Sequence, residues 1–139
     1  GFDVEIEEDF NNGTANTPED DLNVAAQLGG TYTLTSDITL TSTLNVTTEF
    51  TLDLNGKTIK GTWNKSEGAV IKNSGTLKLV GGTVSSTADN GGSAVQNNGI
   101  MTIEDVTLNG APNADGSWPA YTVNNTGKLT IDNSTITSS

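Results

Sequence analysis

Residues 52–59 read LDLNGKTI, and the same pattern returns at residues 77–84, 101–108 and 129–136. The four blocks align without gaps: each has apolar residues at its first, third and eighth positions and threonine at its seventh. Internal repetition of this kind is the signature of a solenoid, in which one short structural unit stacks on the next. The repeat therefore indicates the fold class before any single motif is considered.

A second element lies between these blocks and ends in glycine each time. Its closing glycines, Gly75, Gly99 and Gly127, are 24 and then 28 residues apart. Alternating apolar residues within each period indicate short strands, and Gly and Asn indicate bends that need positive φ. A unit of this size cannot bury its own apolar face, so we expect the coils to stack about 4.8 Å apart, the spacing of paired strands.

The gapless alignment also predicts what fills the rod. Residues 30–49 are expected to form an earlier, less regular coil, which makes about five coils in all. Two apolar columns are predicted: Leu54, Leu79, Ile103 and Ile131 in one, and Ile59, Val84, Leu108 and Ile136 in the other. Asn73, Asn97 and Asn125 are predicted to form a structural ladder in which each amide donates to the next.

A short helix is predicted before the first coil. Thr17 can cap its N-terminus, Pro18 suits its first position, and Gly29 ends it. Such a helix would cover the open end of the first coil and block edge pairing there. Its apolar side is expected to comprise Leu22, Val24, Ala25, Ala26 and Leu28. The chain then divides into an acidic arm (1–16), a capping helix (17–29) and a parallel β-helix (30–139).

Composition and charge exclude several classes of protein. Thr, Asn and Gly number 23, 16 and 16 among 139 residues, which rules out an all-α bundle. With no His and no Cys, Cys/His zinc sites, His-dependent triads and disulfides are excluded, and no cofactor is expected. The net charge of −11, with six Lys and no Arg, makes nucleic acid and anionic membranes poor partners. Eight of the 17 acids precede residue 22, so the rod itself is nearly neutral.

The run FTLDLNGKTI at residues 50–59, together with LGGTYTLTSDITL at residues 28–40, resembles the right-handed parallel β-helix proteins of the pectate-lyase-like superfamily. More narrowly, it is similar to the non-catalytic β-helix modules of phage virion proteins and bacterial surface proteins. The resemblance covers about residues 17–139 and implies an all-β, right-handed parallel β-helix solenoid. It does not imply one function, because this superfamily includes lyases, hydrolases, adhesins and virion parts.

No catalytic set carries over from that superfamily. Its lyases typically use Arg or Lys as the base with acidic calcium ligands, and its hydrolases use clustered Asp; this chain has no Arg or His and does not match their carboxylate motifs. Glu104 and Asp105 are adjacent at a predicted bend, where neighbouring side chains point to opposite faces. Asp53 and Lys78 are predicted to form no more than an exposed ion pair. The chain is therefore expected not to be an enzyme, and no catalytic or metal-binding residue is assigned.

Each coil carries a connection of variable length between the same two strands, at residues 62–67, 87–91 and 111–119. These loops are expected to project from one side of the rod. Exposed aromatic rings with polar neighbours are typical of carbohydrate and protein contacts. The alternative is that each tryptophan folds over its own loop. The candidate ligand contacts are Trp63, Asp115, Trp118 and Tyr121.

The N-terminal arm has an alternation of its own, with the apolar residues Phe2, Val4 and Ile6 on one face and acids on the other. As a strand, it is expected to dock onto a neighbouring subunit or a parent domain. A disordered acidic tether is the alternative. The first residue is Gly1 and not Met, which indicates a processed or trimmed piece of a longer chain.

These observations favour a non-enzymatic structural or adhesive module displayed on an outer surface. The expected setting is extracellular: a phage virion, as a capsid-decorating or head-fibre component, or a bacterial cell surface. The expected partners are protein (the parent chain, neighbouring subunits or a capsid) and cell-surface glycan, without nucleic acid or membrane insertion. The alternative is a small polysaccharide lyase or glycoside hydrolase, which needs a cluster of carboxylates or Lys in a groove.

Overall fold

The computed structural model describes residues 17–62, 69–86, 90–113 and 121–138. One helix precedes a sheet of twelve strands in these residues. The elements are α1 (Pro18–Leu28), β1 (Gly30–Thr33), β2 (Ile38–Leu40), β3 (Leu44–Val46), β4 (Glu49–Asp53), β5 (Thr58–Gly61), β6 (Ala69–Asn73), β7 (Thr76–Ser86), β8 (Asn90–Asn97), β9 (Ile100–Asn113), β10 (Val123–Asn125), β11 (Lys128–Asp132) and β12 (Thr135–Ser138).

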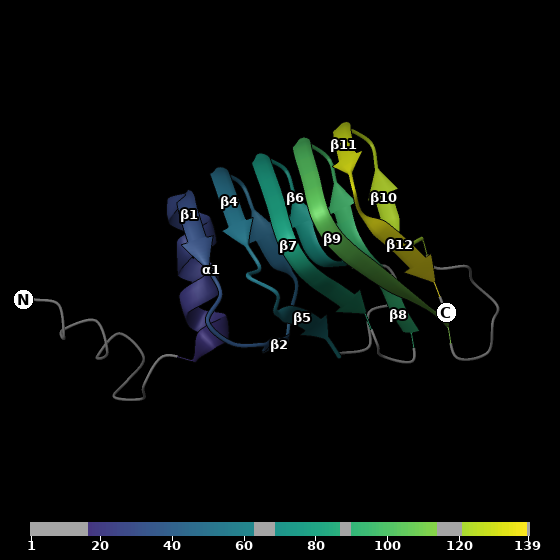
Figure 1. The fold of residues 1–139 in the computed structure, drawn as a ribbon, viewed down its shortest axis with the longest axis horizontal. Helices are drawn as coiled ribbons and strands as arrows, with labels where there is room; N and C mark the ends of the chain where they lie inside the picture. The colour runs from purple at the N-terminus through teal and green to yellow at the C-terminus, as the bar shows by residue number, and fades with distance from the viewer. Residues whose placement is uncertain (1–16, 63–68, 87–89, 114–120, 139) are drawn as a thin grey trace, which may run out of the picture.

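The strands stack in three columns of parallel neighbours. Column one contains β1, β4, the first halves of β7 and β9, and β11. Column two contains β2, β5, the second halves of β7 and β9, and β12. Column three contains β3, β6, β8 and β10. Figure 1 shows the strands following one another from α1 at one end to β10, β11 and β12 at the other. The predicted all-β parallel solenoid is confirmed.

The number of coils is smaller than predicted, because the solenoid has about three turns and not five. The strands from β4 to β10 form the regular turns. The turn before them is built from strands of only three or four residues. The part after them contains β11 and β12 without a column-three strand in the described residues. The repeat overestimates the turns because a short or incomplete block counts as much as a full one.

Apolar columns fill the interior, and one of them was predicted correctly. The column of Ile59, Val84, Leu108 and Ile136 is in register and continues to Ile38. The other column is Tyr32, Leu52, Leu79, Ile103 and Ile131. The predicted place of Leu54 in this second column was therefore wrong.

Leu54 leaves the column because the corner after β4 is two residues longer than the same corner in the next turn. Asn55 and Gly56 form this corner with positive φ angles of 53° and 76°. Leu54 is buried there, and its Cβ lies only 2.4 Å from the place that a Cβ on Gly82 would occupy. Glycine at position 82 thus leaves space for the two extra residues of the corner after β4. A gapless alignment cannot show such an insertion.

The predicted asparagine ladder is confirmed. Asn73 Nδ2 donates to Asn97 Oδ1 at 2.8 Å, and Asn97 Nδ2 donates to Asn125 Oδ1 at 2.8 Å. Each asparagine also closes its own corner, since its Oδ1 accepts from the N–H of the glycine two residues later at 3.1–3.2 Å. Asn73 and Asn97 are fully buried. Their amides therefore pair with backbone groups that water cannot reach.

The glycines of these corners leave space for the backbone of the preceding turn. A Cβ on Gly99 would lie 2.3 Å from Gly75 O, and a Cβ on Gly127 would lie 2.2 Å from Gly99 O. The same carbonyl groups join the turns, because Ile100 N–H donates to Gly75 O at 2.9 Å and Lys128 N–H donates to Gly99 O at 2.8 Å. Close approach of two backbones thus requires glycine here.

α1 begins and ends where the sequence predicts. Thr17 Oγ1 accepts from Asp20 N–H, and the Asp20 carboxylate accepts from Thr17 N–H, both at 3.1 Å, which forms a capping box. Leu22 belongs to the core, as does Ala26. Val24 and Leu28, however, are 50% and 79% exposed, so their predicted place on the apolar side was wrong. Each lies two positions beyond a buried residue, which is nearly opposite on a helix of 3.6 residues per turn.

The helix closes one end of the solenoid, as predicted (Figure 1). Thr48 Oγ1 donates to Ala26 O at 2.7 Å, which ties the last turn of the helix to the corner between β3 and β4. Near the start of the helix, the Glu19 carboxylate accepts from Thr41 N–H at 2.9 Å and from its hydroxyl at 3.0 Å. These bonds fix both the position and the direction of α1 across the first turn.

Tyr32 lies beside the helix and makes the stability of the protein depend on pH. Burial, and then the charge of Asp21, raises the pKa of Tyr32 above its ordinary value of 10.0. Because the folded pKa exceeds the unfolded one, this contribution to stability is complete below pH 10.0 and is lost as the pH rises through the folded pKa.

We therefore expect urea unfolding above pH 10.0 to show a steeper loss of stability in the wild type than in Tyr32→Phe. Tyr121→Phe, a change at an exposed tyrosine, should follow the wild type and serves as the control. Parallel pH curves for the wild type and Tyr32→Phe would contradict this expectation.

Candidate functional site

The connections after β5, β7 and β9 leave the solenoid at one corner, between column two and column three, where the short connection from β2 to β3 also lies. The residues around the first two connections are in register, because Gly61 pairs with Ser86 and Ala69 pairs with Ser93. Successive connections therefore begin and end on neighbouring rungs, about 4.8 Å apart. The prediction that these connections join the same two columns is confirmed for the residues that flank them. We name this corner the loop edge, and its described residues are Thr62, Ser86, 90–92, 111–113 and Tyr121.

A short antiparallel ribbon joins the second and third connections. Asn90 pairs with Asn113, and Gly92 pairs with Ala111, so β8 begins and β9 ends outside the stacked columns. The sequence pattern placed these residues in loops, because Asn, Gly and Pro are typical of turns. Three residues on each side are also too few for an alternating signal. The ribbon gives the loop edge a hydrogen-bonded base that bridges two neighbouring turns.

Tyr121 points outward because the residue after it is anchored inside. Thr122 Oγ1 donates to Thr137 O at 2.7 Å, and Thr122 O accepts from Ala94 N–H at 3.0 Å. Adjacent residues of an extended segment point to opposite sides. Tyr121 is accordingly 65% exposed, whereas Thr122 is buried. Of the predicted ligand contacts, Tyr121 is the one that the structure describes, and it lies at the surface of the loop edge.

The other predicted contact residues stay predictions. Thr62 and Tyr121 are the described residues nearest in sequence to the two tryptophans, and both are exposed. The loop edge therefore brings together the points where the two tryptophan-containing segments leave and rejoin the rod. The candidates outside the described residues are Phe2, Val4, Ile6, Trp63, Asp115 and Trp118.

No protein family, curated protein or solved structure matches this chain. The resemblance to the pectate-lyase-like superfamily, and with it the right-handed course of the coils, stays a prediction.

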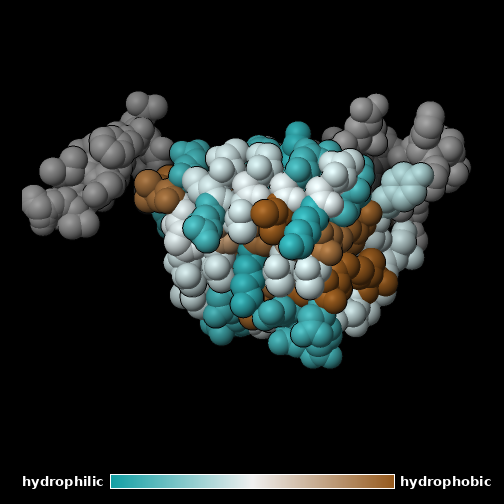
Figure 2. Space-filling view, turned by 90° about the horizontal axis from the view of Figure 1, so that it is seen from above, coloured by the Kyte–Doolittle hydropathy of each residue, from teal (hydrophilic) through white to brown (hydrophobic). Residues whose placement is uncertain are grey.

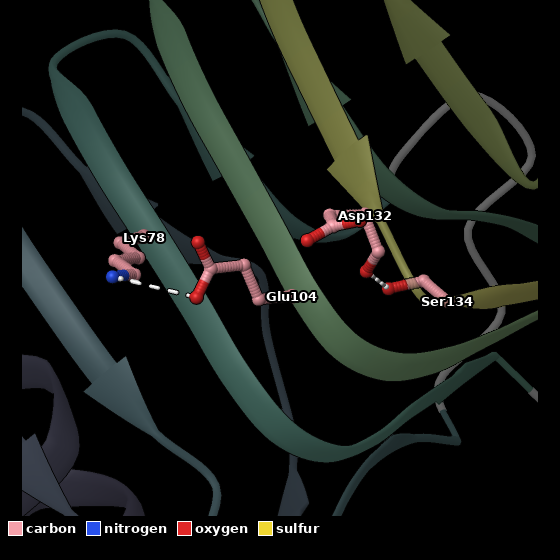
Figure 3. A network of polar contacts seen from close by, with 4 residues as sticks. All are labelled: Lys78, Glu104, Asp132 and Ser134. Atoms are coloured by element: carbon pink, nitrogen blue, oxygen red, sulfur yellow. Dashed lines mark hydrogen bonds and ion pairs between the residues drawn. The ribbon is translucent and has the colours of Figure 1, made fainter.

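A charged pair lies on the outer face of column one, away from the loop edge. Lys78 Nζ lies 3.5 Å from Glu104 Oε1, and the two side chains are 46% and 39% exposed (Figure 3). The predicted pairing of Lys78 with Asp53 was wrong, because the longer corner shifts the register: Lys78 lies opposite Thr51, and Asp53 opposite Val80. An exposed ion pair contributes at most about 1 kcal/mol to stability.

Asp105, the acid next to this pair, shapes the corner between columns one and two. It has a positive φ of 57°, as Asn133 has (47°) in the next turn. Asn133 Nδ2 donates to the Asp105 carboxylate. In the same corner, Ser134 Oγ donates to Asp132 O at 2.8 Å, as Figure 3 shows. Asp and Asn tolerate the left-handed conformation better than most residues. These side chains therefore hold the bend.

Two exposed hydroxyl-bearing side chains lie at the described part of the loop edge. It presents the phenol of Tyr121 and the hydroxyl of Thr62 beside the backbone of the ribbon. In the described part of the chain, no three His, Cys, Asp or Glu side chains come together in a group that could hold a metal ion. No helix among the described residues is long and apolar enough to cross a lipid bilayer.

Proposed function

We propose that this chain is a non-enzymatic structural and adhesive module, displayed on an outer surface, that contacts protein or glycan through the loop edge. The loop edge itself carries the proposal. Its connections differ in length, yet they begin and end on neighbouring rungs of one scaffold. A solenoid that gathers its variable segments at one corner can hold several contacts in a line at constant spacing.

Aromatic residues supply the contact chemistry of this proposal. Tyr121 offers a 65% exposed ring at the end of the third connection. In the sequence, Trp63 directly follows Thr62, and Trp118 lies three residues before Tyr121. Flat rings bury area against a sugar or a protein surface while polar neighbours fix the orientation. The three aromatic side chains are therefore proposed to act on the same partner.

The charge of the rod fits contact better than electrostatic capture. After residue 21 the chain has nine acids and six Lys, so the rod has a net charge of −3 out of the total of −11. A surface of low net charge does little to steer a charged ligand. The proposed setting is extracellular, on a phage capsid as a decoration or head-fibre component or on a bacterial cell surface. The proposed finer fold is a right-handed parallel β-helix of the pectate-lyase-like superfamily.

An array of bacterial surface polysaccharides and envelope proteins tests this function. We expect the wild type to bind at least one array member. Trp63→Ala, Trp118→Ala or Tyr121→Ala should each weaken that binding about tenfold or more, because buried aromatic side chains dominate interface energies. Leu28→Ala is the matched control, since it removes an exposed apolar side chain from α1, outside the loop edge, and should leave binding unchanged.

Three results would contradict the proposal. Binding that none of the aromatic substitutions weakens would exclude the loop edge as the contact surface. Failure to bind any member of the array would remove the adhesive role. Release of reducing ends or unsaturated sugars from a polysaccharide would support the lyase or hydrolase alternative instead.

A further inference from the structure

The end of the solenoid opposite α1 is an open β-edge. In the described residues, β10, β11 and β12 each pair with the preceding turn on one side only. Ile131 and Ile136 are 39% and 44% exposed, whereas Ile103 and Leu108, their column neighbours one turn earlier, are fully buried. Figure 2 shows hydrophobic surface gathered toward this end of the molecule. The open end therefore exposes backbone groups and apolar side chains together.

The asparagine ladder also reaches this end, where its last amide makes fewer hydrogen bonds than the amide before it. Asn97 Nδ2 donates to Gly99 O at 3.1 Å, to Asn125 Oδ1 at 2.8 Å and to Lys128 O at 2.9 Å. Among the described residues, Asn125 Nδ2 donates to Gly127 O alone, at 3.1 Å. An edge with free donors and an apolar interior is a template for another β-edge.

Among the described residues, the open end of a second copy offers a β-edge that can reach this position. At the other end, α1 covers the first turn: Leu22 and Ala26 enter the core, and Thr48 bonds to the backbone of the helix. Stacking the open end of one copy on the first turn of another is therefore blocked. The open end of a second copy is accessible, and contact between two identical surfaces generates a twofold axis.

We infer that the open end binds the open end of a second copy, with β11 antiparallel to β11 of the partner about Thr130. The sequence of β11 is self-complementary in this register. Lys128 lies opposite Asp132 of the partner subunit, and Leu129 lies opposite Ile131 of the partner subunit. Two ion pairs and two apolar pairs result, because the axis generates each pair twice.

The two faces of β11 match this pairing. Leu129 packs against the core, and Ile131 is in register with the buried Ile103. Lys128, Thr130 and Asp132 alternate with them and are exposed. The apolar pairs therefore continue the interior of the rod from one copy into the next. The Lys–Asp pairs lie outside, where charged groups keep their water.

The distribution of charge favours the same arrangement. Residues 121–138 contain one Lys and one Asp, so the open end is neutral. Glu19, Asp20 and Asp21 lie in α1 at the far end, and five further acids precede them in the sequence. Pairing through the open ends puts the two acidic helices as far apart as the rods allow, which minimises repulsion between chains of net charge −11.

Charge reversal tests the pairing. Lys128→Asp and Asp132→Lys each place like charges at both pairs, and each should raise the Kd of the dimer about tenfold in sedimentation equilibrium at low ionic strength. The two substitutions move the net charge in opposite directions, so a weakening shared by both cannot come from net charge. Lys78→Glu, at an exposed residue of an inner turn, is the control and should keep the wild-type Kd.

Combining the two changes should restore association. In an equimolar mixture of Lys128→Asp and Asp132→Lys chains, each Asp again meets a Lys, and the same holds for the double exchange within one chain. Both side chains are exposed, so the variants should keep the wild-type circular dichroism spectrum. A wild type that stays monomeric up to millimolar concentration, single variants that associate like the wild type, or a mixture that stays monomeric would overturn the inference. Each would assign the open end to another occupant, such as a coil from a different chain.

Discussion

Replacing Gly99 with alanine is expected to lower the free energy of unfolding by about 3–5 kcal/mol, the upper range for a single substitution. The new Cβ would lie 2.3 Å from Gly75 O, closer than the backbone can tolerate. That carbonyl group cannot move freely, because it accepts from Ile100 N–H at 2.9 Å and so joins two turns. The turns must separate or lose this bond, and urea unfolding measures the loss.

Gly56→Ala is the matched control for this substitution. A Cβ on Gly56 has no atom within 4 Å, but its φ of 76° is left-handed, so alanine there should cost about 1–2 kcal/mol through backbone strain. The same chemical change thus separates a steric cause at Gly99 from a conformational cause at Gly56. Equal losses in the two variants would show that contact between the turns is not what requires glycine at position 99.

Replacing Asn97 with leucine is expected to lower the free energy of unfolding by about 3 kcal/mol. Asn97 is fully buried, accepts from Asn73 Nδ2 and Gly99 N–H, and donates to the next asparagine. Leucine has a similar size but no polar group, so it leaves buried donors and acceptors without partners at about 1–3 kcal/mol each. Urea unfolding of the variant measures this effect.

Asn125→Leu makes the same chemical change at the exposed end of the ladder. Water can replace the lost partners there, so we expect a loss of no more than about 1 kcal/mol. The difference between the two variants isolates the contribution of burial. A similar loss at both positions would mean that the ladder contributes only through the local Asn-x-Gly corner.

The stacked columns were predictable from the repeat because each turn contains the same residues that form the same local contacts. An asparagine two residues before a glycine closes its own corner, and the next copy of the motif meets the same groups one turn later. The copies of that motif at residues 73–75, 97–99 and 125–127 therefore support one register. The column of Ile59, Val84, Leu108 and Ile136 was predictable for the same reason.

The misplaced residues depend on contacts that no local pattern records. Leu54 leaves its column because two extra residues are accommodated opposite Gly82, which lies in another turn. Val24 and Leu28 are apolar, but the direction in which α1 docks leaves them in solvent. Both cases require knowledge of which segments face each other in space.

The candidate site was predictable in its position and only partly in its structure. Variation in length between repeats located the loop edge, because insertions are tolerated where the chain leaves the rod. The ribbon between residues 90–92 and 111–113 was not predictable, since turn-forming residues carry no sign of pairing. Tyr121 was predicted to be a contact from its residue type, and its exposure depends on the anchoring of Thr122.

The ladder spans 24 residues in one turn and 28 in the next, yet both amide bonds measure 2.8 Å. The rod thus keeps one rise per turn whatever the length of the chain between its corners. A difference of four residues between the two spans leaves both ladder bonds in place, so a longer connection at this corner should cost little stability. Foreign peptides inserted at the loop edge should be tolerated for the same reason. The solenoid therefore holds variable sequences at fixed positions along its axis.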